Sequence, residues 1–204
     1  MFDNRMRQVK ETVFQPFVAC FPQLPPLVLT LISLLFGLFA FGALLYQIHW
    51  LAFAAWFLNR VFDALDGVLA RWQGSQSDLG GYLDILVDFV VYAMIPIGLV
   101  WGKPSAIGYV VLAIMLAAFY VNAASWMYLS AILEKRAVGA DSRGEQTTIT
   151  MPAGIVGGTE TVIIYGLFIM FHQWYVYLFG LMTFLVVITI LQRFVWAVKN
   201  LDGK

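Results

Sequence analysis

The sequence has few charged residues and almost no cysteine. Of its 204 residues, 12% are Asp, Glu, Lys or Arg, about half the share that soluble domains carry, and 61% are hydrophobic. These proportions exclude an ordinary soluble domain and predict an integral membrane protein. The formal net charge is zero, so nothing indicates a nucleic-acid partner. The single cysteine, Cys20, excludes an intrachain disulfide.

The N-terminal segment also lacks the uninterrupted apolar core of a signal peptide. Its hydrophobic residues recur at helical steps of three and four, at Phe2, Met6, Val9, Val13 and Phe17. This spacing predicts that residues 1–22 form an amphipathic helix lying in the lipid headgroup layer. A frayed tail is the alternative, because Pro16 interrupts the pattern.

What the sequence does have is long apolar runs. Six are long enough to cross a bilayer, at roughly 20 residues each. We place them at residues 27–46, 50–72, 80–101, 105–133, 152–171 and 174–197. The predicted fold is therefore an all-α, multi-pass membrane domain over residues 23–204, with six transmembrane helices after the interfacial one.

The basic residues predict the orientation in the membrane. With six spans, both termini lie on one side, and that side carries Arg5, Arg7, Lys10, Arg60, Arg71, Lys135, Arg136, Arg143, Arg193, Lys199 and Lys204. The opposite side carries only Lys103. Since Lys and Arg accumulate on the cytoplasmic side, we expect both termini there.

Four aspartates interrupt the second and third apolar runs. An ionised Asp at membrane depth costs at least ~2.5–3.5 kcal/mol, so these residues should face a cavity and have partners. Asp63 and Asp66 lie on one face of the second helix, and Asp84 and Asp88 on one face of the third. At ~1.5 Å per residue, Asp66 lies ~9 Å and Asp88 ~12 Å from the cytoplasmic ends. The two acidic faces can therefore meet at one depth, open to the cytoplasm.

Converging carboxylates repel one another unless positive charge is supplied. Arg60 and Arg71 could neutralise two at most, and hard divalent cations such as Mg²⁺, Mn²⁺ or Ca²⁺ suit the remaining oxygen ligands. Two such ions a few Å apart are a recurrent device for phosphoryl transfer. Arg71, at the cytoplasmic rim, could contact a phosphate.

The same stretch carries a family motif. Asp66-Gly67-x2-Ala70-Arg71-x8-Gly80-x3-Asp84-x3-Asp88, with Asp63 three residues ahead, resembles the signature of the CDP-alcohol phosphotransferases, also called CDP-alcohol phosphatidyltransferases. The resemblance includes six helices behind an amphipathic one. One position departs from the pattern: many members have Asn after a proline at the start of the first helix, where this chain has Leu27 after Pro26.

The resemblance implies an enzyme of phospholipid synthesis that displaces CMP from a CDP-linked lipid or alcohol and joins the phosphate to an acceptor hydroxyl. It implies a homodimer with two divalent cations, Mg²⁺ or Mn²⁺. The orientation predicted from the basic residues places the active site on the cytoplasmic side. The implied metal ligands are Asp63, Asp66, Asp84 and Asp88. Asp88 would also take the acceptor's proton as the catalytic base. The implied nucleotide-binding surface is Gly67, Ala70, Arg71 and Gly80.

The acceptor alcohol stays open among glycerol 3-phosphate, serine, inositol or its phosphate, and a diradylglycerol. Glu160, eight residues into the fifth predicted helix, is expected at the depth of Asp88 and could bind the acceptor or pair with an arginine. Arg136 and Arg143 could hold a phosphorylated acceptor. Asn122 is better explained as an interhelical hydrogen bond than as a ligand.

A cation channel or transporter is the alternative function, because acids inside a membrane also mark ion pathways. A pathway would place polar groups through the full thickness of the membrane. Here the non-cytoplasmic halves of the predicted spans are almost uniformly apolar, which favours a pocket that opens on one side.

Overall fold

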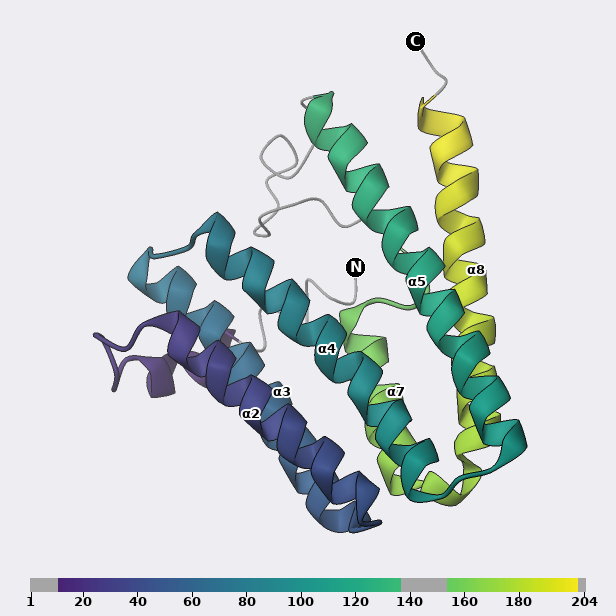
Figure 1. Ribbon diagram of the computed structural model, residues 1–204. Coiled ribbons are helices and arrows are strands. Elements are labelled where there is room, and N and C mark those ends of the chain that lie inside the picture. The colour runs from purple at the N-terminus through teal and green to yellow at the C-terminus, as the bar shows by residue number, and fades with distance from the viewer. Residues whose placement is uncertain (1–10, 137–153, 202–204) are drawn as a thin grey trace.

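The computed structural model describes residues 11–136 and 154–201, and within these ranges the chain is helical, without a strand. The helices are α2 (Pro26–Leu45), α3 (His49–Gln73), α4 (Asp78–Gly102), α5 (Ala106–Lys135), α7 (Gly158–Met170), a 3-10 turn η1 (His172–Trp174) and α8 (Tyr175–Leu201) (Figure 1). Residues 11–18 are also helical. The amphipathic helix expected over residues 1–22 stays a prediction, because residues 1–10 lie outside the described ranges.

The six numbered α-helices correspond one to one with the six predicted spans. Four regions are long and apolar enough to cross a membrane: α2, α4, α5 and the continuous stretch His172–Leu201. Helix α3 is long enough at 25 residues but carries the acids and arginines, and α7 has only 13 residues, or ~20 Å. A count of six crossings therefore stays a prediction.

The fifth predicted span begins later than expected. Residues 154–157 are not helical, and α7 starts at Gly158 rather than at residue 152. The reason is local: glycines at 154, 157 and 158 disfavour helix, and Glu160 caps the helix by accepting a hydrogen bond from the Gly157 N–H at 3.0 Å. Glu160 is thus in the first turn of α7, not eight residues along it.

Helix α2 packs against both α3 and α4, and α5 packs along α8, with α7 contacting α3, α4 and α8 (Figure 1). Small residues of α2 allow the close approach. A Cβ atom at Gly37 would lie 2.6 Å from Val91 of α4 and 3.3 Å from the side-chain nitrogen of Asn59 on α3. Ser33, one turn earlier, is fully buried. Ser33 and Gly37 therefore serve the packing of α2 against its neighbours.

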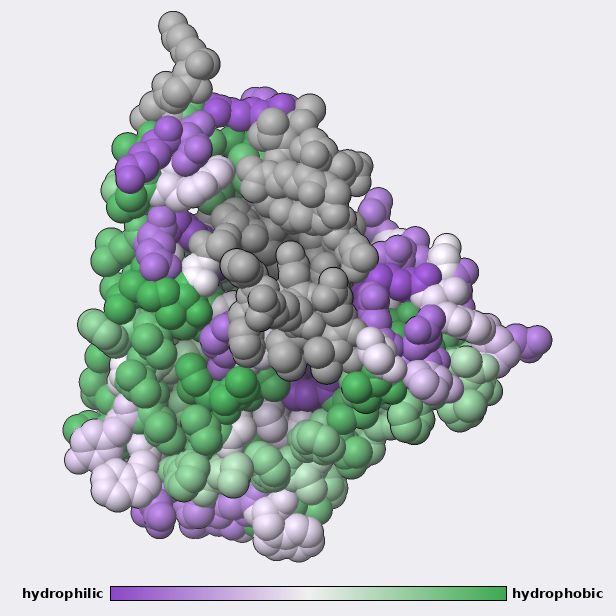
Figure 2. Space-filling view, turned by 180° about the vertical axis from the view of Figure 1, so that it is seen from behind, coloured by the Kyte–Doolittle hydropathy of each residue, from purple (hydrophilic) through white to green (hydrophobic). Residues whose placement is uncertain are grey.

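The surface has the distribution expected for a membrane protein. Figure 2 shows hydrophobic residues over the left and lower part of the face seen from behind, and hydrophilic residues gathered at its upper left, right and bottom margins. Two arginines that the orientation argument placed at helix ends are buried within helices instead: Arg60 in α3 and Arg193 in α8. In α8, Arg193 donates to Asn122 Oδ1 of α5 at 2.5 Å, so the expected interhelical bond of Asn122 is confirmed.

The orientation can be tested with single cysteines in a Cys20→Ser background. Ser75, between α3 and α4, and Gln173, between α7 and α8, are both exposed. The connection from α3 to α4 and the one from α7 to α8 lie at opposite ends of the helices (Figure 1). Ser75→Cys should react with a membrane-impermeant maleimide only from the cytoplasmic side of sealed vesicles, and Gln173→Cys only from the other. Labelling of position 75 from the outside would invert the predicted topology.

Candidate active site

A single buried arginine connects the acids of α3 to those of α4. The Arg60 side chain is 8% exposed, and its Nη1 lies 2.7 Å from Asp88 Oδ1 and 3.6 Å from Asp63 Oδ2. Asp63 is one helical turn further along α3, whereas Asp88 reaches Arg60 from α4. The side chain of Asp88 is 29% exposed, so it pairs with Arg60 while remaining accessible. The sequence-based expectation that the two acidic faces meet is realised here through a guanidinium.

Asp66 is held from the neighbouring helix α2. It is 6% exposed, and its Oδ2 accepts a hydrogen bond from the Thr30 hydroxyl at 2.5 Å. The charges of Asp63 and Asp88 both act on it, which places the three carboxylates in one electrostatic environment. A hydroxyl donor and a fixed backbone therefore define the position of the most buried acid.

Aromatic and amide groups enclose the other side of Arg60. Its guanidinium carbon lies 4.9 Å from the centroid of the Trp56 ring and 5.2 Å from that of Tyr92, within the range of cation–π attraction. Its Nε donates to Asn59 Oδ1 at 2.6 Å, and Asn59 Nδ2 donates to the Ser33 carbonyl at 2.7 Å. Residues of α3 and α4 thus fix this cation directly, and Ser33 of α2 holds Asn59 in place.

Arg71 has a partner outside the acidic group. Its Nε donates to Glu11 Oε1 at 2.8 Å, so this arginine is not bound to a motif aspartate. A Cβ atom at Gly67 would lie 3.3 Å from Arg71 Nη1, which explains how the glycine one turn earlier makes room for the guanidinium. A cavity of about 200 Å³ opens beside Arg71, lined also by Glu11, Gln15, Val68 and Trp72.

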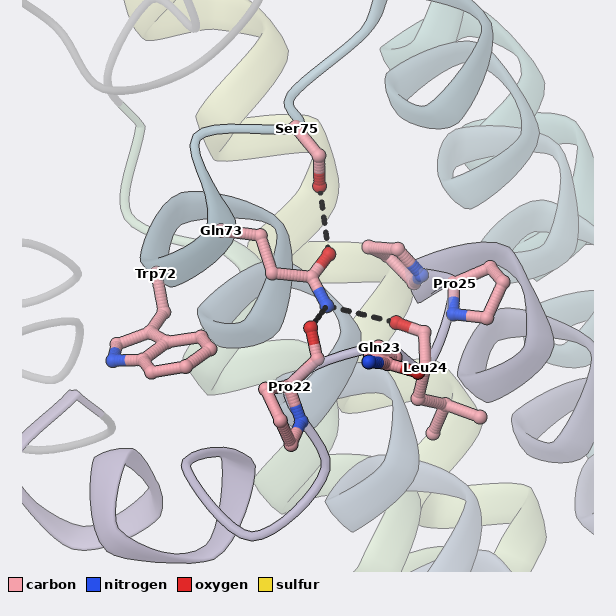
Figure 3. A pocket seen from close by; sticks show the side chains of 8 residues that line it. Pro22, Gln23, Leu24, Pro25, Trp72, Gln73 and Ser75 are labelled. Carbon is pink, nitrogen blue, oxygen red and sulfur yellow. Dashed lines mark hydrogen bonds between the residues drawn. The ribbon is translucent and has the colours of Figure 1, made fainter.

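A second cavity, of about 580 Å³, lies where the chain enters α2 and leaves α3. Figure 3 shows the carboxamide of Gln73 at its centre: Nε2 donates to the carbonyls of Pro22 and Leu24 at 3.1 and 2.9 Å, and Oε1 accepts from Ser75. Neither cavity is lined by the aspartates. Both lie at the end of α3 where Ala70 and Arg71 are found.

The remaining motif positions lie as follows. Asp84 is half-buried on α4, one turn before Asp88. Gly80 lies in the first turn of α4, and its N–H donates to the hydroxyl of the N-cap residue Ser77 at 3.1 Å. Ala70 is half-buried on α3 beside Arg71.

Two of the three candidates for acceptor binding, Glu160 and Arg136, have other partners among the described residues. Glu160 caps α7 through its bond to the Gly157 N–H, and no pairing with Arg60 or Arg71 is observed for it. Arg136 donates to the Leu201 carbonyl at 2.9 Å, at the ends of α5 and α8. Arg143 lies outside the described residues. Acceptor roles for these residues stay predictions.

The donor chemistry of the acidic group fits a hard divalent cation, because it consists of carboxylate oxygens. The arrangement is not a preassembled metal site, however: among the described residues no three His, Cys, Asp or Glu side chains are placed to hold one ion. The guanidinium of Arg60 explains this arrangement of the acids, because it contacts both Asp63 and Asp88. Of the two arginines expected to neutralise acids of the motif, Arg60 pairs with two of them, whereas Arg71 pairs with Glu11.

Three comparisons with known proteins agree with this architecture. Residues 23–192 match the sequence profile of the CDP-alcohol phosphatidyltransferase family. The chain is 30% identical over 158 residues to inner membrane protein YnjF of Escherichia coli (strain K12), covering 76% of this chain and 73% of YnjF. Its fold is similar to that of Mycobacterium tuberculosis phosphatidylinositol phosphate synthase (PgsA1) crystallised with CDP-DAG bound. There the TM-score is 0.65, the sequence identity 19%, and 92% of each chain is covered.

Proposed function

Because this chain belongs to the CDP-alcohol phosphatidyltransferase family, we propose that it displaces CMP from a CDP-linked lipid and transfers the phosphate to an acceptor alcohol. The observation that carries the proposal is the meeting of α3 and α4 acids around Arg60, with the complete motif from Asp63 to Asp88 on the same two helices. CDP-DAG, bound by the structural relative from Mycobacterium tuberculosis, is the donor class to test first.

In the proposed reaction, the acceptor oxygen forms a bond to the lipid-bearing phosphorus, and the bond from that phosphorus to the CMP oxygen breaks. Asp88 takes the proton of the acceptor hydroxyl, since it is the exposed member of the Arg60 pairs. Arg71 would hold a donor phosphate beside Gly67, Ala70 and Gly80, exchanging its bond to Glu11 for one to the ligand.

We propose that two divalent cations, Mg²⁺ or Mn²⁺, bind at Asp63, Asp66, Asp84 and Asp88. When bound, such ions neutralise the negative charge of the phosphates and of the transition state. The protein's own groups then orient the reactants: Thr30 fixes Asp66, and Arg60 fixes Asp88. A homodimer with a cytoplasmic active site belongs to the same proposal.

The channel alternative gains no support from the described core. Beyond Tyr92, the halves of α2, α3 and α4 that face away from the acids pack through Ala40, Leu44, Ala52, Ile95 and Leu99, all buried and apolar. A continuous polar path would have to pass through this cluster. A one-sided pocket is the arrangement that fits it.

The proposal predicts CMP release that depends strictly on a divalent cation. Purified protein should release CMP from labelled CDP-diacylglycerol only when the correct alcohol from a panel is present, and only with Mg²⁺ or Mn²⁺. The panel comprises glycerol 3-phosphate, serine, inositol, inositol phosphate and a diradylglycerol. Full activity in excess chelator would contradict the metal part of the proposal. Absence of release with every acceptor and cation would contradict the transfer itself.

A further inference from the structure

Arg60 carries a positive charge into the place where the proposed function needs a different cation. Its side chain is nine-tenths buried, it contacts carboxylates from two helices, and its Nη2 has no hydrogen-bond partner among the described residues. A buried donor without a partner is costly, so the position needs a reason. The need to neutralise two carboxylates explains the pairs with Asp63 and Asp88. It does not explain why the buried Nη2 of Arg60 has no hydrogen-bond partner among the described residues.

The carboxylates that bind Arg60 are two of the four proposed metal ligands. A guanidinium and a divalent cation on the same oxygens would repel each other, and each carboxylate oxygen offers only limited coordination. The two cations therefore cannot both occupy Asp63 and Asp88 at full strength. One must weaken the binding of the other, and by linkage the effect is reciprocal.

We propose that Arg60 is an internal counter-cation, which occupies Asp63 and Asp88 in the cation-free protein and competes with a divalent ion for them. This inference rests on the proposed function, since it takes these aspartates as cation ligands. Arg60 holds the acids together while no ion is bound, so that they do not repel. It also sets the cation concentration at which the site fills.

Neighbours of Arg60 other than the carboxylates also stabilise its charge. The rings of Trp56 and Tyr92 lie 4.9 and 5.2 Å from the guanidinium and attract a cation through their faces. The Nε bond to Asn59, at 2.6 Å, holds the guanidinium from another edge. These contacts still stabilise the charge of Arg60 when an ion takes over Asp63 and Asp88.

The test measures the cation affinity of the full-length protein in detergent, by thermal unfolding against Mn²⁺ concentration. A ligand that binds the folded state raises the unfolding temperature, so the curve gives the Mn²⁺ concentration of half-maximal stabilisation. Arg60→Met removes the charge and keeps an apolar chain between the two rings. Arg60→Lys keeps the charge but cannot bridge two carboxylates with a planar fork. Arg193→Met removes another buried arginine, on α8, and serves as the matched control.

We expect Arg60→Met to unfold at a lower temperature than the wild type in chelator, and to bind Mn²⁺ about tenfold more tightly, within the usual range of coupling between competing ligands. Arg60→Lys should lie between the two. Arg193→Met should lose stability without any change in the half-maximal Mn²⁺ concentration. If Arg60→Met does not fold, a lower half-maximal concentration for Arg60→Lys supports the proposal, and an equal or higher one overturns it.

The outcomes separate this inference from the function beneath it. If Mn²⁺ stabilises the wild type and Arg60→Met at the same concentration, or the variant only at a higher one, Arg60 is a structural ion pair and the competition is wrong, while the cation site stands. If Mn²⁺ stabilises neither the wild type nor any variant, the proposed cation site is wrong, and the proposed competition is wrong with it.

Discussion

Asp66→Asn is expected to lower CMP release by at least ~100-fold, or ~2.7 kcal/mol of barrier. The substitution removes the charge that a divalent cation would bind while changing the shape of the side chain very little. The Asn oxygen can still accept the hydrogen bond that Thr30 donates at 2.5 Å, so the contact between α2 and α3 should survive. The loss should therefore appear in catalysis, and the measurement is CMP release at saturating donor, acceptor and Mn²⁺.

Two control variants show whether the loss of activity is specific to the charge of Asp66. Asp78→Asn changes an exposed acid in the first turn of α4, outside the motif, and should keep wild-type activity. Thr30→Val removes the donor to Asp66 but leaves the carboxylate charge, so its loss should be smaller than that of Asp66→Asn. Retention of more than about a tenth of the activity by a folded Asp66→Asn protein would argue against a cation ligand at this position (~1.4 kcal/mol).

The helices themselves were predictable because long apolar runs leave few alternatives in a membrane. The ends of α2, α3, α4 and α5 lie within a few residues of the predicted ones, since polar and Gly- or Pro-containing loops bound them on each side. The start of α7 was not predictable from hydropathy. The apolar residues before Gly158 look like helix by composition, and only the glycines and the capping role of Glu160 end the pattern.

The acids of the site were found from spacing, but the partner of two of them was not. Trp56, Arg60 and Asp63 follow at steps of four and three on α3, so they share one face, and Tyr92 follows Asp88 by four on α4. This spacing could have predicted from the sequence that Arg60 lies between aromatic rings and carboxylates. What it could not supply is the rotation of α3 against α4, which decides that Arg60 meets Asp88 at 2.7 Å. That rotation depends on the close packing at Gly37 and Ser33.

The pairing of Arg71 with Glu11 could not be predicted from the sequence, for a different reason. Glu11 is 60 residues away in the sequence, in a segment whose contact with α3 depends on how the chain turns before Pro26. The hydrogen bonds of Gln73 to the carbonyls of Pro22 and Leu24 fix that turn (Figure 3). No helical periodicity in the sequence predicts a contact between segments this far apart. It means that a donor phosphate reaching Arg71 must compete with a carboxylate already bound there.

The variant Asp88→Asn distinguishes a role of Asp88 as the catalytic base from a role as a metal ligand. The variant keeps one oxygen that can accept from Arg60 Nη1, now 2.7 Å from Asp88, but it cannot take a proton from the acceptor hydroxyl. We expect turnover to fall ~10²–10⁴-fold, the usual range for loss of general base catalysis. Affinity for the CDP-linked donor should weaken far less, because Gly67, Ala70 and Arg71 on α3 are proposed to hold the nucleotide.

Turnover and donor affinity must be measured on the same preparation of Asp88→Asn, with Asp78→Asn as the control for loss of an acid from α4. The side chain of Asp88 is 29% exposed, whereas Asp66 is buried, so Asp88 is the more accessible acid for a docked hydroxyl. If donor affinity collapses as steeply as turnover, Asp88 acts chiefly as a cation ligand. The proton must then leave by another route, and Glu160 could serve only by giving up its bond to the Gly157 N–H.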